Sequence, residues 1–173
     1  MDFDRILDVL MYSVPAVVTG FVAFYFFKTH TTNEEKRMKI SLLKQKNKDV
    51  LPIKLQAYER MTLFLERIDP GKLLLRIAPT SDNKITYTQH LIDTIEQEYN
   101  YNIAQQIYIS DECWNVIIAA KNATLHLIKS NSENEELLNS SQLREAILKS
   151  LVKTSSPSTA ALAYIKTEVR EML

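Results

Sequence analysis

The chain begins with an apolar stretch that no charged residue interrupts. Residues 9–27, VLMYSVPAVVTGFVAFYFF, form nineteen uncharged positions. At about 1.5 Å of rise per helical residue, they would cover about 28 Å, close to the thickness of a bilayer hydrocarbon core. Residues 1–8 lack the basic start of a signal peptide, and no small-residue cleavage site follows the stretch. The pattern predicts an uncleaved transmembrane helix over 9–27.

Beyond this stretch, hydrophobic residues recur three and four positions apart, which is typical of amphipathic helices. A polar segment over 28–51 has few apolar positions, and it predicts a juxtamembrane helical stalk that ends at Pro52. A helix with one apolar face is expected over 53–68. The Asp69-Pro70-Gly71 sequence then predicts a stop, followed by a packed loop over 72–80.

The same periodicity continues to the C-terminus. One helix is expected to begin near Thr86 or Thr88 and to reach Ile107, and the next is expected to begin at the cap Ser110. A polar linker over 130–141 follows. Two further helices are expected, one that includes Leu143 to Leu151 and one that runs from Ser156-Pro157 to Met172. Residues 52–173 are therefore predicted to form a small helical bundle of about four or five helices. The expected fold class is all-α, with one N-terminal transmembrane helix.

Charge beside the apolar stretch predicts its orientation. Residues 1–8 carry a net charge of −2, whereas residues 28–48 carry seven Lys or Arg side chains against two Glu, a net charge of +5. Positive residues favour the cytoplasmic side of a bacterial inner membrane. The N-terminus is therefore expected outside and the C-terminal domain in the cytoplasm. The basic residues Lys28, Lys36, Arg37 and Lys39 are candidate contacts for anionic lipid.

Small residues give the predicted membrane helix a second candidate role. Ala16, Thr19, Gly20 and Ala23 form small-xxx-small pairs, which let another helix approach closely. Such pairs also occur by chance in short apolar helices. A plain lipid anchor and a specific helix contact therefore both remain open.

Composition excludes several functional classes. Gly71 is the only glycine besides Gly20, so neither a P-loop nor a dinucleotide fingerprint can be written. Cys113 is the only cysteine, which excludes an internal disulfide and fits a reducing compartment. Residues 49–173 carry a net charge of −3, which does not favour nucleic-acid binding.

No catalytic or metal motif is recognisable. His90 and Asp93 form one H-x-x-D pair, which is too few ligands for a metal site, and His126 between two leucines is expected to be a partly buried structural residue. Cys113 and the serines have no recognisable base beside them. We expect no cofactor, no small-molecule substrate and no enzymatic activity, and a membrane enzyme of unfamiliar type is the third-ranked alternative.

An uncharged strip is the best candidate for a protein interface. On a continuous helix, Tyr101, Gln105 and Tyr108 would align, with Asn102 and Gln106 beside them. Tyr is enriched and charge is depleted where proteins meet. The alternative is that Tyr108 closes the core and the amides are hydrated.

Two stretches carry a family resemblance. LQAYERMTLFLERIDP at 55–70 and EYNYNIAQQIYIS at 98–110, followed by Trp114 and Ala120-Lys121, resemble an uncharacterised bacterial family of small single-pass inner-membrane proteins. The resemblance implies an inner-membrane setting and no mechanism. The leading functional hypothesis is a non-catalytic, membrane-anchored accessory or scaffold subunit that binds a larger membrane protein. The alternative is a tethered adaptor that recruits a soluble partner or anionic lipid.

Overall fold

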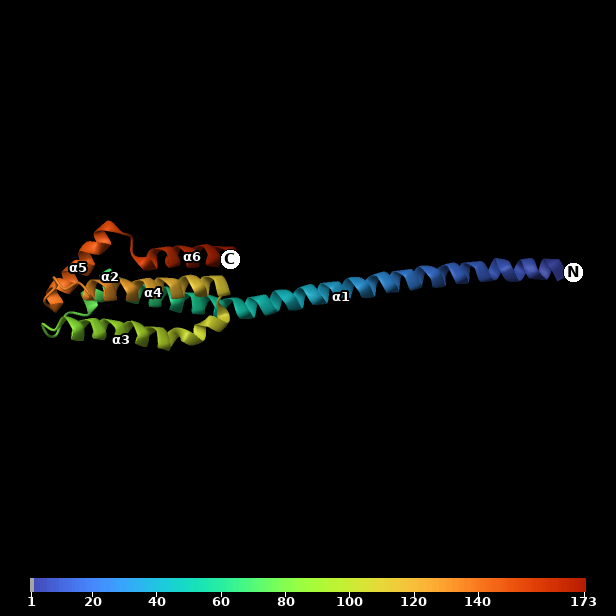
Figure 1. The fold of residues 1–173 in the computed structure, drawn as a ribbon. Coiled ribbons are helices and arrows are strands. Elements are labelled where there is room, and N and C mark those ends of the chain that lie inside the picture. The colour runs from blue at the N-terminus through green and yellow to red at the C-terminus, as the bar shows by residue number, and fades with distance from the viewer. Residues whose placement is uncertain (1) are drawn as a thin grey trace. The chain divides into compact units, whose positions relative to one another are not determined.

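Every element assigned in residues 2–173 is a helix, which confirms the all-α prediction (Figure 1). The computed structural model describes residues 2–173, with side chains for all except 2–10, 12, 14, 32–33, 35–36, 43–44, 46–47 and 153. The chain divides into two compact units between Asp49 and Val50. The elements are α1 (Asp2–Ile68), α2 (Pro70–Arg76), α3 (Lys84–Asn102), the 3-10 helix η1 (Ile103–Tyr108), α4 (Asp111–Ser132), α5 (Ser140–Lys153) and α6 (Pro157–Met172).

The membrane-spanning prediction requires a correction. Among the residues whose side chains the structure describes, no helix contains a stretch both long and apolar enough to cross a membrane. Val9, Leu10, Tyr12 and Val14 of the predicted span lie outside the described side chains. The structure thus contradicts the single-pass fold, the inner-membrane location and the orientation derived from them.

Helix α1 also continues where the sequence predicts a break. Pro52 lies inside the helix instead of ending a separate juxtamembrane segment. An internal proline costs a helix about 3 kcal/mol, because it removes one backbone hydrogen bond. Downstream, α1 buries Met61, Phe64 and Leu65 almost completely, and each such side chain contributes about 1.5–3 kcal/mol. This burial offsets the proline and keeps the segment helical.

The segment after α1 is a short helix, whereas the sequence predicts a loop. Asp69 ends α1 and caps α2, because its side chain accepts a hydrogen bond of 3.2 Å from the Lys72 backbone N–H. Pro70 occupies the first turn, where its missing N–H costs nothing. The stop prediction is therefore confirmed, and the loop prediction is wrong because the Asp-Pro pair also starts a helix. Leu73 and Leu74 are buried on its inner face.

Helix α3 ends earlier than its apolar spacing suggests. Asn83 caps its start by accepting hydrogen bonds from the Ile85 and Thr86 backbone N–H groups, at 2.9 and 3.1 Å. At the other end, Asn102 Nδ2 donates to the Glu98 carbonyl oxygen at 2.8 Å, and Asn102 has φ −113° and ψ −4°. Asn side chains compete with the backbone for carbonyl groups. The chain then tightens into η1 instead of continuing as an α-helix.

Helices α4 and α6 begin where the sequence predicts, whereas α5 begins at Ser140, inside the predicted linker over 130–141. Ser110 caps α4, since its hydroxyl oxygen accepts a hydrogen bond of 3.1 Å from the Cys113 backbone N–H. Ser156 caps α6, and Pro157 follows it in the first turn. Asn139 caps α5 in the same way, with a bond of 2.9 Å from the Gln142 N–H. These caps satisfy backbone donors that a helix start leaves unpaired.

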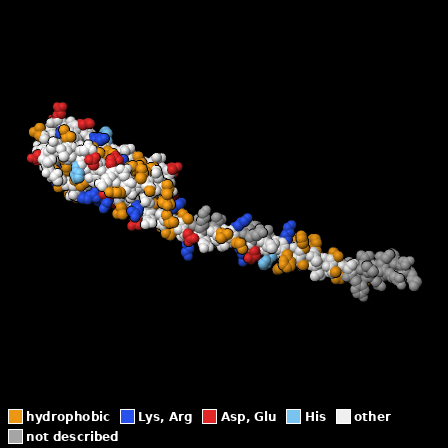
Figure 2. All heavy atoms as spheres, turned by 90° about the horizontal axis from the view of Figure 1, so that it is seen from below, with side chains coloured by type: hydrophobic (Ala, Val, Ile, Leu, Met, Phe, Trp, Pro, Cys, Tyr) orange, Lys and Arg blue, Asp and Glu red, His pale blue; other side chains and the backbone are white. Residues whose placement is uncertain are grey.

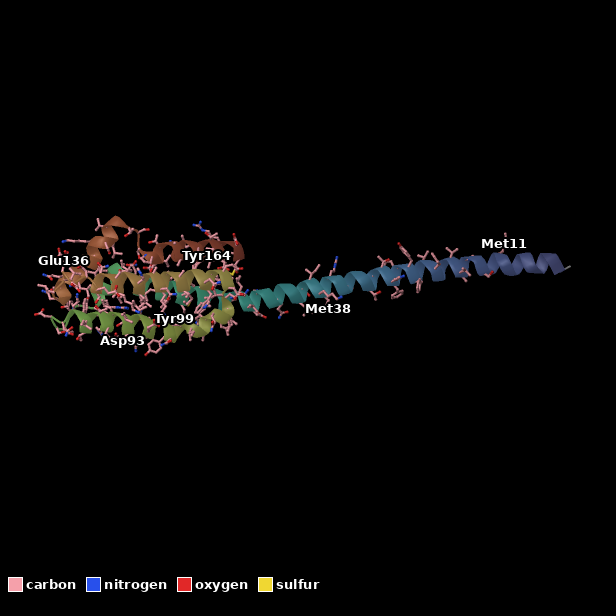
Figure 3. All side chains as sticks on the ribbon, viewed as in Figure 1. Met11, Met38, Asp93, Tyr99, Glu136 and Tyr164 are labelled. Atoms are coloured by element: carbon pink, nitrogen blue, oxygen red, sulfur yellow. The ribbon has the colours of Figure 1, made fainter. Side chains whose placement is uncertain are left out.

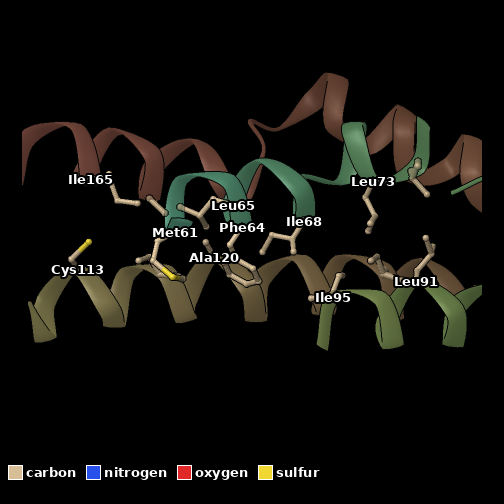
Figure 4. Packing of buried hydrophobic residues seen from close by; sticks show 14 of the residues in the cluster. Met61, Phe64, Leu65, Ile68, Leu73, Leu91, Ile95, Cys113, Ala120 and Ile165 are labelled. Carbon is tan, nitrogen blue, oxygen red and sulfur yellow. The ribbon is translucent and has the colours of Figure 1, made fainter. Parts of the chain in front are cut away.

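One hydrophobic core holds the C-terminal unit together, and Figure 4 shows part of it. The last turns of α1 contribute Met61, Phe64, Leu65 and Ile68, which pack against side chains of the other helices. Helix α4 packs against both α3 and α6. The core residues from these partners include Leu91 and Ile95 of α3, Cys113, Ile117 and Ala120 of α4, and Ala161 and Ile165 of α6. The N-terminal unit contributes no residue to this described core.

Candidate functional site

The predicted interface strip has a different geometry from the one expected. Tyr101 lies in the last turn of α3, whereas Gln105 and Tyr108 lie in η1. A 3-10 helix has three residues per turn, so Gln105 and Tyr108 share a face of η1, and the continuous alignment with Tyr101 is lost. Tyr101 is 72% exposed and Tyr108 is 40% exposed. Both rings thus reach the surface, and Tyr108 does not close the core.

The amide side chains of the strip divide between structure and solvent. Asn102 is half-buried, and its side-chain amide donates a hydrogen bond to the backbone of α3. Gln105 is half-buried and Gln106 is exposed. The Tyr101 hydroxyl oxygen accepts a hydrogen bond of 3.0 Å from Gln97 Nε2, one turn earlier. Asn102 therefore shapes the turn into η1, and Gln106 presents its amide to solvent.

Exposed aliphatic side chains that the sequence analysis missed extend the strip. Ile107 is 72% exposed and Ile103 is 39% exposed, and both belong to η1. Leu63 of α1 is 56% exposed and lines the same surface groove as Tyr101. We call Leu63, Tyr101, Ile103, Ile107 and Tyr108 the α3–η1 face. The i, i+4 spacing of the two isoleucines does not align them on a 3-10 helix, so their exposure identifies them and the sequence pattern gave no signal.

Ion pairs border this face on one side. Arg67 donates from one guanidinium nitrogen, Nη1, to both carboxylate oxygens of Glu98, at 2.9 and 3.0 Å. Arg76 Nη1 lies 3.6 Å from Glu98 Oε1, and Arg76 Nη2 donates to the Arg67 carbonyl oxygen at 3.2 Å. Glu98 therefore pairs with both arginines, and of these Arg67 lines the same groove as Tyr101.

A cavity of about 460 Å³ includes Ile107 and Tyr108 of the face in its lining. Its lining comes from three separate segments of the chain: Lys54 and Tyr58 of α1, the consecutive residues Ile107, Tyr108, Ile109 and Ser110 at the end of η1 and before α4, and Glu168, Glu171 and Met172 of α6. We call it the acidic cavity, because two carboxylates face one ammonium group. Sequence reasoning missed it, since residues more than a hundred positions apart meet there.

Two groups near Glu168 stay protonated at neutral pH: Tyr58, which lines the acidic cavity, and Cys113, which is buried in the core. The Ser110 backbone N–H donates a hydrogen bond of 3.4 Å to the Tyr58 hydroxyl oxygen. Burial raises the pKa of Tyr58 to about 12, and neighbouring Glu168 adds to the rise, whereas the Ser110 bond opposes it. Burial also raises the pKa of the Cys113 thiol to about 12, with a further contribution from Glu168. Both groups are neutral at pH 7, and Cys113 is not activated as a nucleophile.

Tyr58 and Cys113 are the polar neighbours of the Glu168 carboxylate. Side-chain hydrogen bonds to Glu168 contribute to the raised pKa of both groups, although the buried Oε2 atom of Glu168 lacks a partner at close hydrogen-bond distance among the described residues. Neither Glu168, Glu171 nor Lys54 belongs to any ion pair found between described side chains.

The prediction of a partly buried His126 is wrong. His126 is exposed, although the flanking leucines predict partial burial. It lies on the outer side of α4, because Thr124 and Ile128 occupy the buried face. Beside the exposed His90, Asp93 Oδ1 accepts a hydrogen bond of 2.7 Å from Gln89 Nε2.

The candidate contact residues of α1 are all at the surface where described. Ala16, Thr19, Gly20 and Ala23 are exposed, and a Cβ atom added at Gly20 would meet no atom within 4 Å. Lys28, Arg37 and Lys39 are exposed, whereas Lys36 lies outside the described side chains. Met11 and Met38, labelled in Figure 3, are 74% and 63% exposed along the same helix. The helix and lipid contacts of these residues stay predictions.

Comparison with known protein families gives one match. The model of a family of unknown function, DUF7935, matches residues 4–172, which is nearly the whole chain. The chain belongs to the DUF7935 family. The predicted resemblance to an uncharacterised family is confirmed at this level. No curated protein and no solved structure matches this DUF7935 chain.

Proposed function

We propose that this DUF7935 chain is a non-catalytic accessory or scaffold subunit that binds a larger protein partner. The α3–η1 face is the observation that carries the proposal. Leu63, Tyr101 and Ile107 are each more than half exposed, and no member of the face is charged. Exposed apolar side chains that gather in one place mark interaction sites, and Tyr is enriched in their buried centres.

The first unit offers further support. Described apolar side chains at 15–27 of α1 are exposed, and they include four consecutive aromatic residues at 24–27. Such a surface is costly in water, so a partner helix that packs on Ala16 and Gly20 would lower the free energy of the chain. The bacterial setting implied by the family resemblance belongs to the same proposal.

Mutation of a single exposed isoleucine tests the proposal. The full chain is extracted under mild conditions with its native partners, and the size of each complex is measured by light scattering. Ile107→Asp places a charge in the middle of the α3–η1 face and should dissociate the complex. The matched control is Ile85→Asp, because Ile85 is 74% exposed and lies in the first turn of α3, where a carboxylate is tolerated.

The expected result is a complex for the wild type and for Ile85→Asp, and a free chain for Ile107→Asp. Circular dichroism confirms that both variants retain their helices. A free monomer from the wild type would contradict the proposal. Equal complex sizes for all three proteins would contradict the assignment to the α3–η1 face.

A further inference from the structure

We infer that the surface groove between α1 and the end of α3 receives an acidic amphipathic helix of the partner. This inference rests on the proposed function, because it names the chemistry of the segment that covers part of the α3–η1 face. The groove has a volume of about 330 Å³, and Leu63 and Tyr101 of that face belong to its lining. A partner on the face therefore also meets the charged groups of the groove.

Charge identifies the partner segment. The groove is lined by the guanidinium groups of Arg60 and Arg67 and by one carboxylate, that of Glu98. Glu98 also pairs with Arg76, so three arginines lie near a single carboxylate. Arg60 is exposed and belongs to no ion pair found between described side chains. The groove is thus positively charged, although residues 49–173 carry a net charge of −3. An acidic segment is its electrostatic complement.

The groove has hydrogen-bond donors for the carboxylates of such a segment. Both hydrogen bonds from Arg67 to Glu98 come from one guanidinium nitrogen, Nη1. The Arg67 side chain is 58% exposed, so its other N–H groups can donate to a carboxylate that approaches from solvent. Arg60 lies about two helical turns before Arg67 on the same face of α1. Two acidic residues about two turns apart on a partner helix can therefore meet both arginines.

The surface of α1 favours a helix as the partner segment. Five exposed residues, spaced three and four positions apart, lie along one face of α1: Ile53, Gln56, Arg60, Leu63 and Arg67. The same spacing aligns side chains where two helices pack side by side. Leu63 and Ile53 provide apolar contacts between the charged positions, so an isolated anion would leave them uncovered. An amphipathic helix with both apolar and acidic positions matches the whole stripe.

A peptide titration of the full chain tests the inference without the partner. The probe is a helical peptide about three heptads long with the repeat Glu-Leu-Ala-Ala-Leu-Glu-Ala, which places Glu on both sides of a Leu stripe. The control peptide carries Lys in place of every Glu. Binding is followed by the chemical shifts of the Leu63 and Tyr101 backbone N–H groups. We expect saturable shifts with the Glu peptide and about tenfold weaker binding of the Lys peptide.

Substitution of the arginines tests the assignment to the groove. Arg60→Gln should weaken binding of the Glu peptide about threefold, and the double variant Arg60→Gln/Arg67→Gln about tenfold. In the double variant, Glu98 can still pair with Arg76. Arg170→Gln is the matched control, because Arg170 is exposed on α6 and does not line the groove. It should titrate like the wild type.

Three results would overturn the inference. They are the absence of a saturable shift with the Glu peptide, equal affinity for the two peptides, and equal affinity of the wild type and the double variant for the Glu peptide. Circular dichroism shows whether each variant retains its helices, so that a loss of binding is not a loss of fold.

Recovery of the native complex separates this inference from the proposed function. Partner recovery should fall about tenfold in the double variant and stay unchanged in Arg170→Gln. If Ile107→Asp abolishes recovery while the double variant leaves it unchanged, the α3–η1 face stands and the acidic helix is refuted. If neither Ile107→Asp nor the double variant changes recovery, both proposals fail.

Discussion

Lys121 Nζ donates a hydrogen bond of 2.7 Å to Glu96 Oε2 and thereby joins α4 to α3. The same ammonium group lies 4.1 Å from the centroid of the Tyr99 ring, which packs between Phe64 and Trp114. The Lys121 side chain is only 11% exposed, whereas the Glu96 side chain is 41% exposed. A cation that is nearly buried thus has two favourable partners on the neighbouring helix.

Removal of this cation should weaken the fold modestly. Lys121→Met retains an unbranched apolar stem but loses both the ion pair and the contact with the Tyr99 ring. Because Glu96 can regain water, we expect the free energy of unfolding to fall by about 1 kcal/mol, measured by urea denaturation. The control Lys149→Met breaks an exposed pair with Glu145 and should cause no measurable change. Equal losses in both variants would contradict the special role of Lys121.

The stability of the protein should decrease at high pH. Burial raises the pKa of Cys113 from 9.0 to about 12. Above pH 9 the unfolded chain releases a proton that the folded chain retains, so stability falls by about 1.4 kcal/mol per pH unit for this group. Cys113→Ser does not titrate there and should lack this part of the decrease. Urea midpoints between pH 7 and 11 measure the effect, and identical slopes for both proteins would refute it.

The Asp69 side chain connects two distant segments. It caps α2 through the Lys72 N–H, and its other oxygen accepts a hydrogen bond from the Ser156 hydroxyl, which caps α6. Asp69→Ala should lower the free energy of unfolding by about 1–2 kcal/mol. Asp69→Asn keeps an oxygen for the Lys72 N–H and should lose less. Thermal denaturation distinguishes the two, and an alanine variant as stable as the wild type would contradict the capping role.

Adjacent residues of α1 should respond in opposite ways. Phe64 is 1% exposed in the core, whereas Leu63 is 56% exposed on the α3–η1 face. Phe64→Ala should destabilise the fold by about 3–5 kcal/mol. Leu63→Ala should change stability by less than about 0.5 kcal/mol yet weaken recovery of the partner. The opposite pattern in denaturation and recovery experiments would show that the face is assigned to the wrong side of α1.

Local capping rules predict much of the bundle. Ser110 and the Ser156-Pro157 pair start helices as expected, because their side chains and the proline act within a few residues. Pro52 shows where local rules fail. Its effect is outweighed by the burial of Met61 and Leu65, and this burial depends on helices far away in the sequence. The transmembrane prediction over 9–27 was wrong as well, because it used only hydropathy and length, and no helix among the described residues is both long and apolar enough to cross a membrane.

The candidate site was predicted only in part. Tyr101 and Tyr108 are surface residues, as the interface hypothesis requires, but Asn102 ends α3 and breaks the alignment that suggested them. Hydrophobic side chains reach the outer surface of the described C-terminal unit in several places (Figure 2). Sequence periodicity cannot separate these from core positions. The acidic cavity depends on Tyr58 and Glu168 meeting in space, which no local pattern encodes.

Site-specific photo-crosslinking in cells tests the central claim most directly. A photoreactive phenylalanine analogue replaces Ile107 in one strain and the equally exposed Ile85 in another, and irradiation traps whatever protein lies against each position. The account predicts a discrete adduct of higher mass from position 107 and none from position 85. No adduct from position 107, or the same adducts from both positions, would contradict a partner bound at the α3–η1 face.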